Sequence, residues 1–507
     1  MRILMPISLP TVLLSLSAVL SGCKHTPNAG SSVSSSTSAA VSVKSLSRNL
    51  LTKTYKDVDT NKVLYTANEQ VRFLADNGSI WSTYERLIAA ARHEVVIASF
   101  HVNAKNTFEK IYGSEAVRND PFEAVASGLI KAQAKLASNQ KLAVRILINL
   151  QYPFDEMPDK EGLGDSLLAE LLPPQFQPDG PGTYFRFTKA LQQKGVDLSK
   201  VSIDFATFKT DYFDNLHDKY LVVDGKDTVV GSGNLHIESS DHPDAHRQTA
   251  VWVRGKAALG VLDSFDRKWT AARTQLWLCD VSRPAFDPEY CKNPRGGKVI
   301  QRDWLNPNFE GSTPVLVLPS PARAYGVKET ATALKTPLND AMLAAIAAAK
   351  VSIKVESPNI SSHDLMKALQ AKAKEGVAVY MVSDFNKDTG AYNLLDTLFS
   401  HGGSNDSVFK EIVPEFNRSL PSGGKPIEVR WYADKGGARV PDGDKQGMNH
   451  SKTLIVDDSL AIVGSANQEF FSWYFSSELN IAYDDPSAVA DTAQRFDKIW
   501  SVSKRVQ

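Results

Sequence analysis

The sequence predicts an α/β protein built as two similar α-β-α sandwich halves, each with a mixed sheet. Two long stretches of the chain follow the same order of elements, in which helices and strands alternate. Most of the strands in each stretch are largely apolar, which is typical of parallel strands that helices cover on both faces. Each stretch then continues into an alternating strand and hairpins, so antiparallel strands are expected in the same sheet.

The elements of the first half come in the order helix, strand, helix and strand, and the second half repeats this order. Apolar residues at helical spacing predict the helices, and continuous apolar runs predict the strands. In the first half, we expect a helix over 80–91, a strand over 95–100, a helix over 122–136 and a strand over 144–150. In the second half, we expect a helix over 338–346, a strand over 351–355, a helix over 365–374 and a strand over 377–382. We therefore predict one domain over 60–300 and another over 301–507, each closing around its own sheet.

The first 22 residues resemble a bacterial lipoprotein signal peptide. A short start with Arg2 precedes an apolar run, and Leu20-Ser21-Gly22-Cys23 resembles a lipobox, in which the cysteine is lipidated. An ordinary signal peptide with a chance cysteine is the alternative. Lipidation of Cys23 would anchor the chain in the bacterial cell envelope, and we expect the outer membrane, facing the periplasm. Residues 23–59, which are rich in Ser, are expected to form a flexible tether.

Two further cysteines, Cys279 and Cys291, follow far along the chain. An oxidising periplasm would favour a disulfide between them, and two buried, unpaired thiols are the alternative. Two cysteines at this separation carry no metal-site signature.

The charge balance excludes a global basic field. Lys and Arg together number 57, as do Asp and Glu, so the formal net charge is +0. An overall neutral charge does not favour binding of the whole protein to nucleic acid. A local basic cleft is the alternative.

Each half carries one copy of the motif His-x-Lys-x-x-x-x-Asp. The copies comprise His217, Lys219 and Asp224 in the first half, and His450, Lys452 and Asp457 in the second. A Gly-Ser-x-Asn segment follows each copy, with Ser232 and Asn234 in the first half and Ser465 and Asn467 in the second. Both asparagines stand 17 residues after their histidine, which makes a chance match negligible.

The spacing within the motif has a mechanical reason. Residues i and i+2 of a strand project to the same face, so the His and Lys of each copy aim at one ligand. Asp224 and Asp457 fall at turns before the next strand and have the wrong parity for the same cleft. We therefore expect a structural role for both.

With these residues the sequence resembles the phospholipase D superfamily, which is named for its paired His-Lys-Asp motifs. The resemblance covers nearly everything after residue 60. It implies a pseudo-twofold arrangement in which both His-Lys pairs face one active site at the interface of the halves, with no metal and no other cofactor. It also implies a covalent phosphohistidine intermediate, with His217 as the nucleophile and His450 as the general acid.

The remaining candidates follow from what this chemistry needs. The side chains that can donate hydrogen bonds to the nonbridging oxygens of a phosphodiester are Lys219, Lys452, Asn234 and Asn467, with support from Ser232 and Ser465. Each imidazole also needs its remote nitrogen held, which in this superfamily falls to a downstream Glu, Asp or Gln. Glu478 and Gln248 occupy like places before apolar strands, although Gln248 read as an ordinary polar strand residue is the alternative. Which histidine each of them contacts stays open.

Three other histidines, His236, His242 and His246, lie in a polar loop. Their spacing makes no recognisable ligand set, so we expect no metal site there.

The substrate is inferred from other features. Lipid anchoring, the neutral net charge and the aromatic segment 470–475 favour a membrane phospholipid, which the protein would hydrolyse or transphosphatidylate. Burial of those rings in the core is the alternative role for the segment. For the function, the alternatives are a metal-independent endonuclease of the same superfamily, with nucleic acid as its partner, and a cardiolipin synthase-like phosphatidyltransferase. We expect a monomer.

Overall fold

The computed structural model describes most of the chain, in ranges separated by gaps. These are residues 41–53, 55, 65–100, 102, 119–149, 183–208, 216–236, 239–240, 245–271, 300–306, 308–320, 336–384, 405–433 and 447–506. The expected signal peptide and Cys23, Cys279 and Cys291 lie outside them, so lipidation and the disulfide stay predictions. All the described residues belong to one structural unit, which comprises 40–325 and 335–507.

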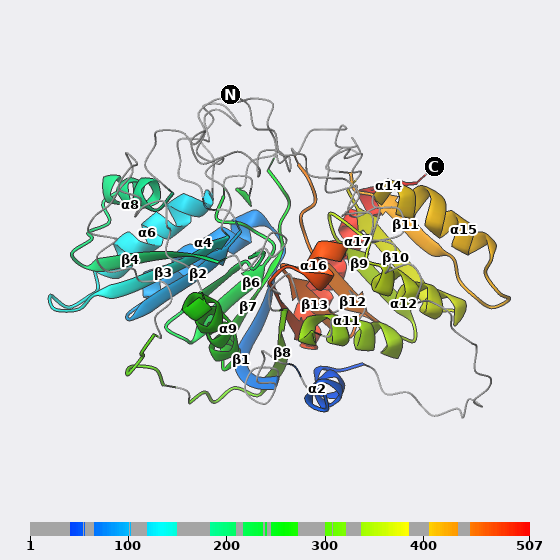
Figure 1. Cartoon of the computed structure of the whole chain (residues 1–507), viewed down its shortest axis with the longest axis horizontal. Helices are drawn as coiled ribbons and strands as arrows, with labels where there is room; N and C mark the ends of the chain where they lie inside the picture. Colours follow the sequence, from blue (N-terminus) through cyan, green and yellow to red (C-terminus); the bar gives the residue numbers. More distant parts are fainter. Residues whose placement is uncertain are drawn as a thin grey trace, which may run out of the picture. The chain divides into compact units, whose positions relative to one another are not determined.

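The first half contains the four expected elements and continues into the hairpin strands of a mixed sheet (Figure 1). Its elements are β1 (Tyr65–Leu74), α4 (Asn77–Ala90), β2 (Glu94–Ser99), α6 (Pro121–Gln133), β3 (Leu142–Asn149), α8 (Thr183–Gln193), β4 (Val201–Phe208), β5 (Tyr220–Val223), β6 (Asp227–Gly231), β7 (Ala250–Gly255) and α9 (Ala257–Ala271). Strands β2, β3 and β4 are parallel to one another. Strands β5, β6 and β7 extend the sheet in antiparallel pairs.

The second half repeats this order. Its elements are β8 (Thr313–Ser320), α11 (Pro337–Ala348), β9 (Ser352–Glu356), α12 (His363–Lys374), β10 (Ala378–Ser383), α14 (Asn405–Ser407), a π-helical turn η7 (Val408–Ile412), α15 (Val413–Arg418), β11 (Ile427–Trp431), β12 (Thr453–Val456), β13 (Leu460–Gly464), α16 (Phe470–Tyr474), β14 (Glu478–Tyr483), α17 (Pro486–Val502) and β15 (Lys504–Arg505). Strands β9, β10 and β11 are parallel, and β12, β13 and β14 pair antiparallel. The predicted α/β class with mixed strand directions is thereby confirmed.

The two halves share one 15-stranded sheet, in place of the two separate sheets that the sequence predicted. Its strand order is β15-β11-β10-β9-β12-β13-β14-β8-β1-β7-β6-β5-β2-β3-β4. Apart from β15, this order is one series of strands followed by its mirror image, and the two series meet where β1 and β8 pair antiparallel. In a separate half, one edge of β1 or β8 would have unpaired backbone N–H and C=O groups. The pairing of β1 with β8 gives these groups hydrogen-bond partners in both halves.

Helices cover both faces of the sheet. Helices α9 and α17 pack into one core with strands of both halves, and large rings such as Phe265, Trp269, Tyr483 and Phe496 fill it. Helices α4 and α6 bury the other face of the first half, and α11 and α12 pack against β8 and β10. No helix among the described residues is both long and apolar enough to cross a bilayer. The shared core fixes the two halves, and with them the two motif copies, relative to each other.

Helix α2 (Val43–Leu51) occupies part of the segment 23–59, and the predicted flexible tether is wrong there. Val43, Leu46 and Leu50 stand at helical spacing and are buried. A capping box of two serines begins the helix, which packs against β8 and α11. The Ser-rich composition of the segment hides this short apolar stripe.

Candidate active site

Each motif segment pairs with the half of the protein that does not contain it. The segment that carries His217 precedes β5. Its Leu216 forms a parallel bridge with Ser477, just before β14. The segment that carries His450 precedes β12 and forms the matching bridge with Arg247, just before β7. His217 donates its backbone N–H to the carbonyl oxygen of Ser477, and His450 donates to that of Arg247, both at 2.9 Å. The crossed pairing brings both histidines to the junction of the two halves.

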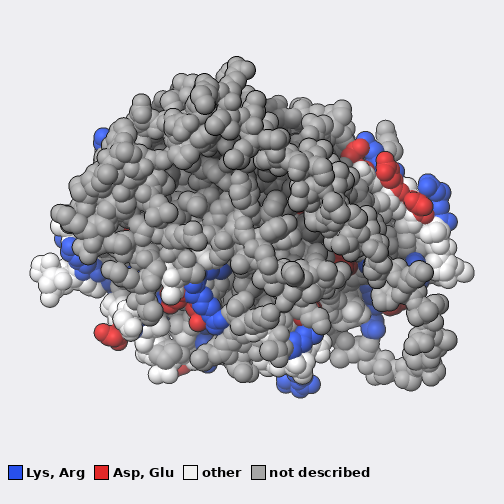
Figure 2. Space-filling model, viewed as in Figure 1, with Lys and Arg blue, Asp and Glu red and all other residues white. Residues whose placement is uncertain are grey.

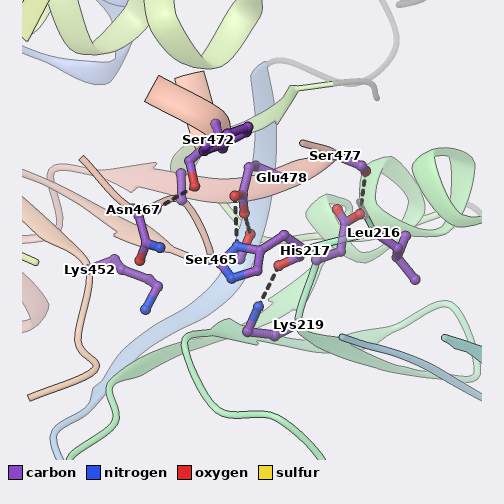
Figure 3. Close-up of polar contacts among 12 residues, drawn as sticks. Leu216, His217, Lys219, Lys452, Ser465, Asn467, Ser472, Ser477 and Glu478 are labelled. Carbon is purple, nitrogen blue, oxygen red and sulfur yellow. Dashed lines mark hydrogen bonds and ion pairs between the residues drawn. The ribbon is translucent and has the colours of Figure 1, made fainter. Parts of the chain in front are cut away.

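The imidazole of His217 is held by a carboxylate of the second half (Figure 3). Its Nδ1 atom lies 2.7 Å from Oε1 of Glu478, which is fully buried at the start of β14. The other oxygen of Glu478 accepts a 2.5 Å hydrogen bond from the hydroxyl of Ser465. The ring of Phe100 packs edge-on against the same imidazole, with 5.3 Å between ring centroids. Because Nδ1 is occupied, Nε2 of His217 is the nitrogen that can meet a ligand.

The imidazole of His450 is held by an amide of the first half. Its Nδ1 atom lies 3.0 Å from Oε1 of Gln248. An amide oxygen only accepts, so His450 donates from Nδ1 and keeps Nε2 for a ligand. The same oxygen accepts a 2.7 Å hydrogen bond from Ser232, and Nε2 of Gln248 donates to Ser239 at 3.2 Å. The question left open by the sequence is thus answered: the glutamate holds the first histidine and the glutamine holds the second.

Ser232 and Ser465 hold these two supporting side chains, which contradicts the prediction that they help to bind phosphate. Both serines are fully buried, and each hydroxyl donates to Gln248 or Glu478. Each hydroxyl oxygen also accepts a backbone N–H, from Thr249 in the first half and from the start of β14 in the second. The hydroxyl proton of each serine is therefore already donated within the protein and is not available to a phosphate oxygen.

Lys219 and Lys452 are buried beside the two imidazoles. Each ammonium group donates to the carbonyl oxygen of its own histidine, at 2.7 Å for Lys219 and 2.6 Å for Lys452. Figure 3 draws both lysines in one cluster with His217 and Asn467. Burial lowers the pKa of Lys219 to about 8. Burial also lowers the pKa of Lys452 well below its ordinary value, and the charge of Lys219 lowers it further. A bound anion would favour the charged form of both lysines.

The pKa values of His450 and Glu478 are shifted in opposite directions. Burial lowers the pKa of His450 well below its ordinary value, and the neighbouring Lys452 and His246 lower it further. Burial raises the pKa of Glu478 to about 7, against the opposing effect of Lys219. His450 is therefore neutral at neutral pH, and the negative charge of a bound phosphodiester would favour its protonation.

Asp224 and Asp457 lie at the turns after β5 and β12, away from this cluster. The carboxylate of Asp224 accepts backbone N–H groups from residues 92–94 at 2.8 Å, and that of Asp457 accepts those of 350–352 at 2.7 to 2.9 Å. Both have positive φ, of 49° and 52°, which aspartate adopts more readily than most residues. Each carboxylate ties its turn to the start of β2 or β9, which is a structural role.

Asn234 and Asn467 follow β6 and β13 and are partly buried. The Oδ1 atom of each is buried and makes no hydrogen bond within the described ranges. This oxygen can only accept, so a hydrogen bond to phosphate would come from the amide nitrogen, and that contact stays a prediction.

Asp218 is a site residue that the sequence did not single out. It lies between His217 and Lys219, is fully buried, and accepts a 2.7 Å hydrogen bond from Nζ of Lys268 on α9. Its other oxygen accepts from the hydroxyl of Ser477, so the ion pair braces the strand start that carries Glu478. The sequence shows Asp218 within the motif, but it does not show that Lys268, which is 50 residues away along the chain, is its partner.

His246 is a second residue that the sequence did not place in the site. Its ring centroid lies 5.6 Å from that of His450. The available signal was its position two residues before Gln248, since residues at this spacing project to the same side of an extended segment.

Comparisons with known proteins bear on this chemistry. A family model described as "Cardiolipin synthase, PLD-like domain" matches residues 342–500. A probable cardiolipin synthase of Bacillus subtilis is 23% identical over 325 residues, which cover 62% of this chain and 52% of that protein. Phospholipase D Y of Dictyostelium discoideum is 28% identical over 171 residues, which cover 29% of this chain and 36% of that protein. The chain spans about half the length of the cardiolipin synthases that it matches.

One solved structure extends the likeness in fold to both halves. Phosphatidylserine synthase of Haemophilus influenzae Rd KW20 aligns with a TM-score of 0.55 over 92% of this chain and 91% of that chain, at 14% identity. At this identity the likeness concerns the fold alone.

Proposed function

We propose that this chain, a member of the phospholipase D superfamily, transfers phosphatidyl groups between alcohols as a cardiolipin synthase-like phosphatidyltransferase. The observation that carries the proposal is the pair of His-Lys sites, each held by a side chain from the opposite half. The sequence favoured hydrolysis of a phospholipid, with transfer as an alternative. The relatives, most of which are named cardiolipin synthases, favour transfer. The two reactions differ only in whether an alcohol or water enters second.

In the first step, Nε2 of His217 attacks the phosphorus of the donor lipid. A bond forms between this nitrogen and phosphorus, the bond from phosphorus to the head-group oxygen breaks, and His450 gives its proton to that oxygen. Lys219 and Lys452 stabilise the charge that gathers on the nonbridging oxygens. The product of this step is a phosphatidyl group on His217 and a free head-group alcohol.

In the second step, an acceptor alcohol takes the place of the head group. Its hydroxyl gives a proton to the now neutral His450, and its oxygen bonds to phosphorus while the bond to His217 breaks. The protons balance over the two steps, because His450 regains the one that it gave away.

The two supporting side chains favour this division of labour. The histidine that becomes covalently modified carries a positive charge in the intermediate, and the buried carboxylate of Glu478 stabilises such a charge on His217. Gln248 is neutral, so His450 holds its proton less firmly and gives it up readily to the leaving oxygen. His217 thus needs a partner that stabilises its positive charge, whereas His450 needs one that does not. Glu478 and Gln248 provide these two environments.

A non-specific nuclease is the rival within the superfamily. Such an enzyme needs a basic track along which the nucleic-acid backbone can lie. On the parts of the face in Figure 2 that the described residues form, Lys and Arg side chains lie beside Asp and Glu at several places. The formal net charge of +0 adds no support for such a track.

The aromatic segment 470–475 supports a lipid substrate less than the sequence suggested. Trp473 and Tyr474 are buried, as the alternative expected, while Phe471 and Phe475 are partly exposed. The case for a lipid therefore depends on the relatives and on the proposed anchor at Cys23, which would hold the site at a bilayer.

The test supplies the purified protein with vesicles of labelled phosphatidylglycerol and, side by side, with single-stranded DNA. We expect cardiolipin and free glycerol as products, and neither from the His217→Ala variant. Phosphatidate as the main product would replace transfer by hydrolysis. Cleavage of DNA without lipid turnover, lost in His217→Ala, would overturn the lipid assignment.

A further inference from the structure

His246 lies against the proposed general acid, and the mechanism above leaves it without a role. The residue is 7% exposed, and its ring meets that of His450 at an angle of 41° with 5.6 Å between centroids. Asn77 fixes the segment, because it donates to the carbonyl oxygen of His246 at 2.7 Å and accepts the N–H of Gln248 at 2.9 Å. The ring of His246 is thus held beside the imidazole that handles the alcohol proton.

The two sides of the site differ in polarity. The ring beside His217 is that of Phe100, whereas the ring beside His450 is a second imidazole. In the proposed reaction both alcohols, the leaving head group and the acceptor, pass on the side of His450, because this residue exchanges protons with them. A polar ring beside His450 therefore lies on the side on which the alcohols pass.

We propose that His246 binds the phosphate of an acceptor that carries its own negative charge, such as phosphatidylglycerol. The inference rests on the proposed transferase function and assigns the acceptor phosphate to one residue of the site. The attacking hydroxyl must reach Nε2 of His450, and a glycerol chain places the phosphate of the acceptor roughly 5 Å beyond that hydroxyl. The ring of His246 stands at a comparable distance from His450, and an imidazolium donates strong, charge-assisted hydrogen bonds to phosphate oxygens.

The order of the proton transfers suits this role. After the first step His450 has given its proton to the leaving alcohol and is neutral. At this stage, when the acceptor must bind, the adjacent His450 carries no positive charge that would repel a charged His246 ring. The acceptor hydroxyl next gives its proton to His450, its oxygen bonds to phosphorus, and the bond from phosphorus to His217 breaks.

The experiment compares two acceptors with the same primary hydroxyl. The full chain receives phosphatidylglycerol vesicles together with labelled free glycerol, so transfer to the lipid yields cardiolipin and transfer to glycerol yields labelled phosphatidylglycerol. In His246→Gln, the ratio of cardiolipin to labelled phosphatidylglycerol should fall about tenfold or more, as expected for the loss of a hydrogen bond to a charged group. A matched control is His93→Gln, which alters a histidine that stacks on Trp304 just before β2 and should keep the ratio.

The outcomes separate the two proposals. If the unaltered protein makes cardiolipin and His246→Gln keeps the ratio, the inference about His246 is wrong and the transferase function stands. If the unaltered protein transfers to neither acceptor, the proposed function itself fails. Should the glutamine variant not fold, His246→Asn removes the same charge from a smaller side chain and is judged by the same ratio.

Discussion

Replacing Glu478 with glutamine removes the charge that the proposed nucleophile depends on. The variant keeps an oxygen next to Nδ1 of His217, where the carboxylate lies at 2.7 Å, but it removes the negative charge. Glu478 is fully buried, so water cannot replace that charge. During the attack His217 becomes positively charged, because its Nε2 bonds to phosphorus while Nδ1 keeps its proton. The variant should therefore slow the formation of the phosphoenzyme.

The magnitude follows from the geometry. Two unit charges about 4 Å apart interact by about 4 kcal/mol at an effective dielectric constant of about 20. Lys219 and Lys452 lie in the same cluster and reduce the net effect of the carboxylate, so we expect a loss of about 2–4 kcal/mol. This corresponds to a rate about 30 to 1000 times lower.

The pH dependence gives a second signature. The pKa of Glu478 is raised to about 7, so its negative charge is lost as the pH falls through this value. The rate of phosphoenzyme formation in the unaltered protein should fall with it, and Glu478→Gln should lack this acidic limb.

The assay is single-turnover formation of the phosphoenzyme, measured across the pH range in which Glu478 titrates. A matched control is Glu375→Gln, which alters an exposed glutamate at the end of α12 and should leave the rate unchanged. A rate for Glu478→Gln within about threefold of the unaltered protein would correspond to less than about 1 kcal/mol, and the charge of Glu478 would then not stabilise His217 during the attack.

Three further variants test the scaffold around the site. Asp224→Ala removes the acceptor of three backbone N–H groups and should lower the free energy of unfolding by about 2–4 kcal/mol in denaturant titrations, while the activity per folded molecule is kept. Asp218→Asn leaves Lys268 buried without its counter-charge and should lower the free energy of unfolding by about 3–5 kcal/mol. Adding Lys268→Met should recover part of this loss. An Asp218→Asn variant as stable as the native protein would exclude the buried ion pair. Leu46→Ala should cost about 2–4 kcal/mol in thermal unfolding, and no change would mean that α2 does not dock.

The fold class could be predicted because its signals are local. Continuous apolar strands such as 95–100 and 377–382 are recognisable in the sequence, and the repeated order of elements showed the duplication. The pairing of β1 with β8 could not be predicted, because the choice between two closed sheets and one continuous sheet depends on edges that meet only in the folded chain. Helix α2 was missed because three apolar residues on one face suffice once β8 and α11 are there to cover them.

The site shows the same division between local and distant information. The spacing of the motif placed His217 and His450 together, and Glu478 and Gln248 were recognisable from their positions before apolar strands. The crossed pairing was not, because each supporting side chain reaches a histidine that is more than 200 residues away along the chain. The role of Ser465 was misjudged for a related reason, since its hydroxyl is used by a partner that only the fold brings near.

The covalent intermediate is the most direct test of the divided roles of the two histidines. A phosphodiester with a good leaving group, such as p-nitrophenol, needs no proton from His450 in the first step. We expect that His450→Asn then accumulates a phosphoenzyme, because nothing deprotonates the acceptor, and that His217→Asn forms none. A phosphoenzyme that accumulates in His217→Asn and is absent from His450→Asn would reverse the roles of the two histidines.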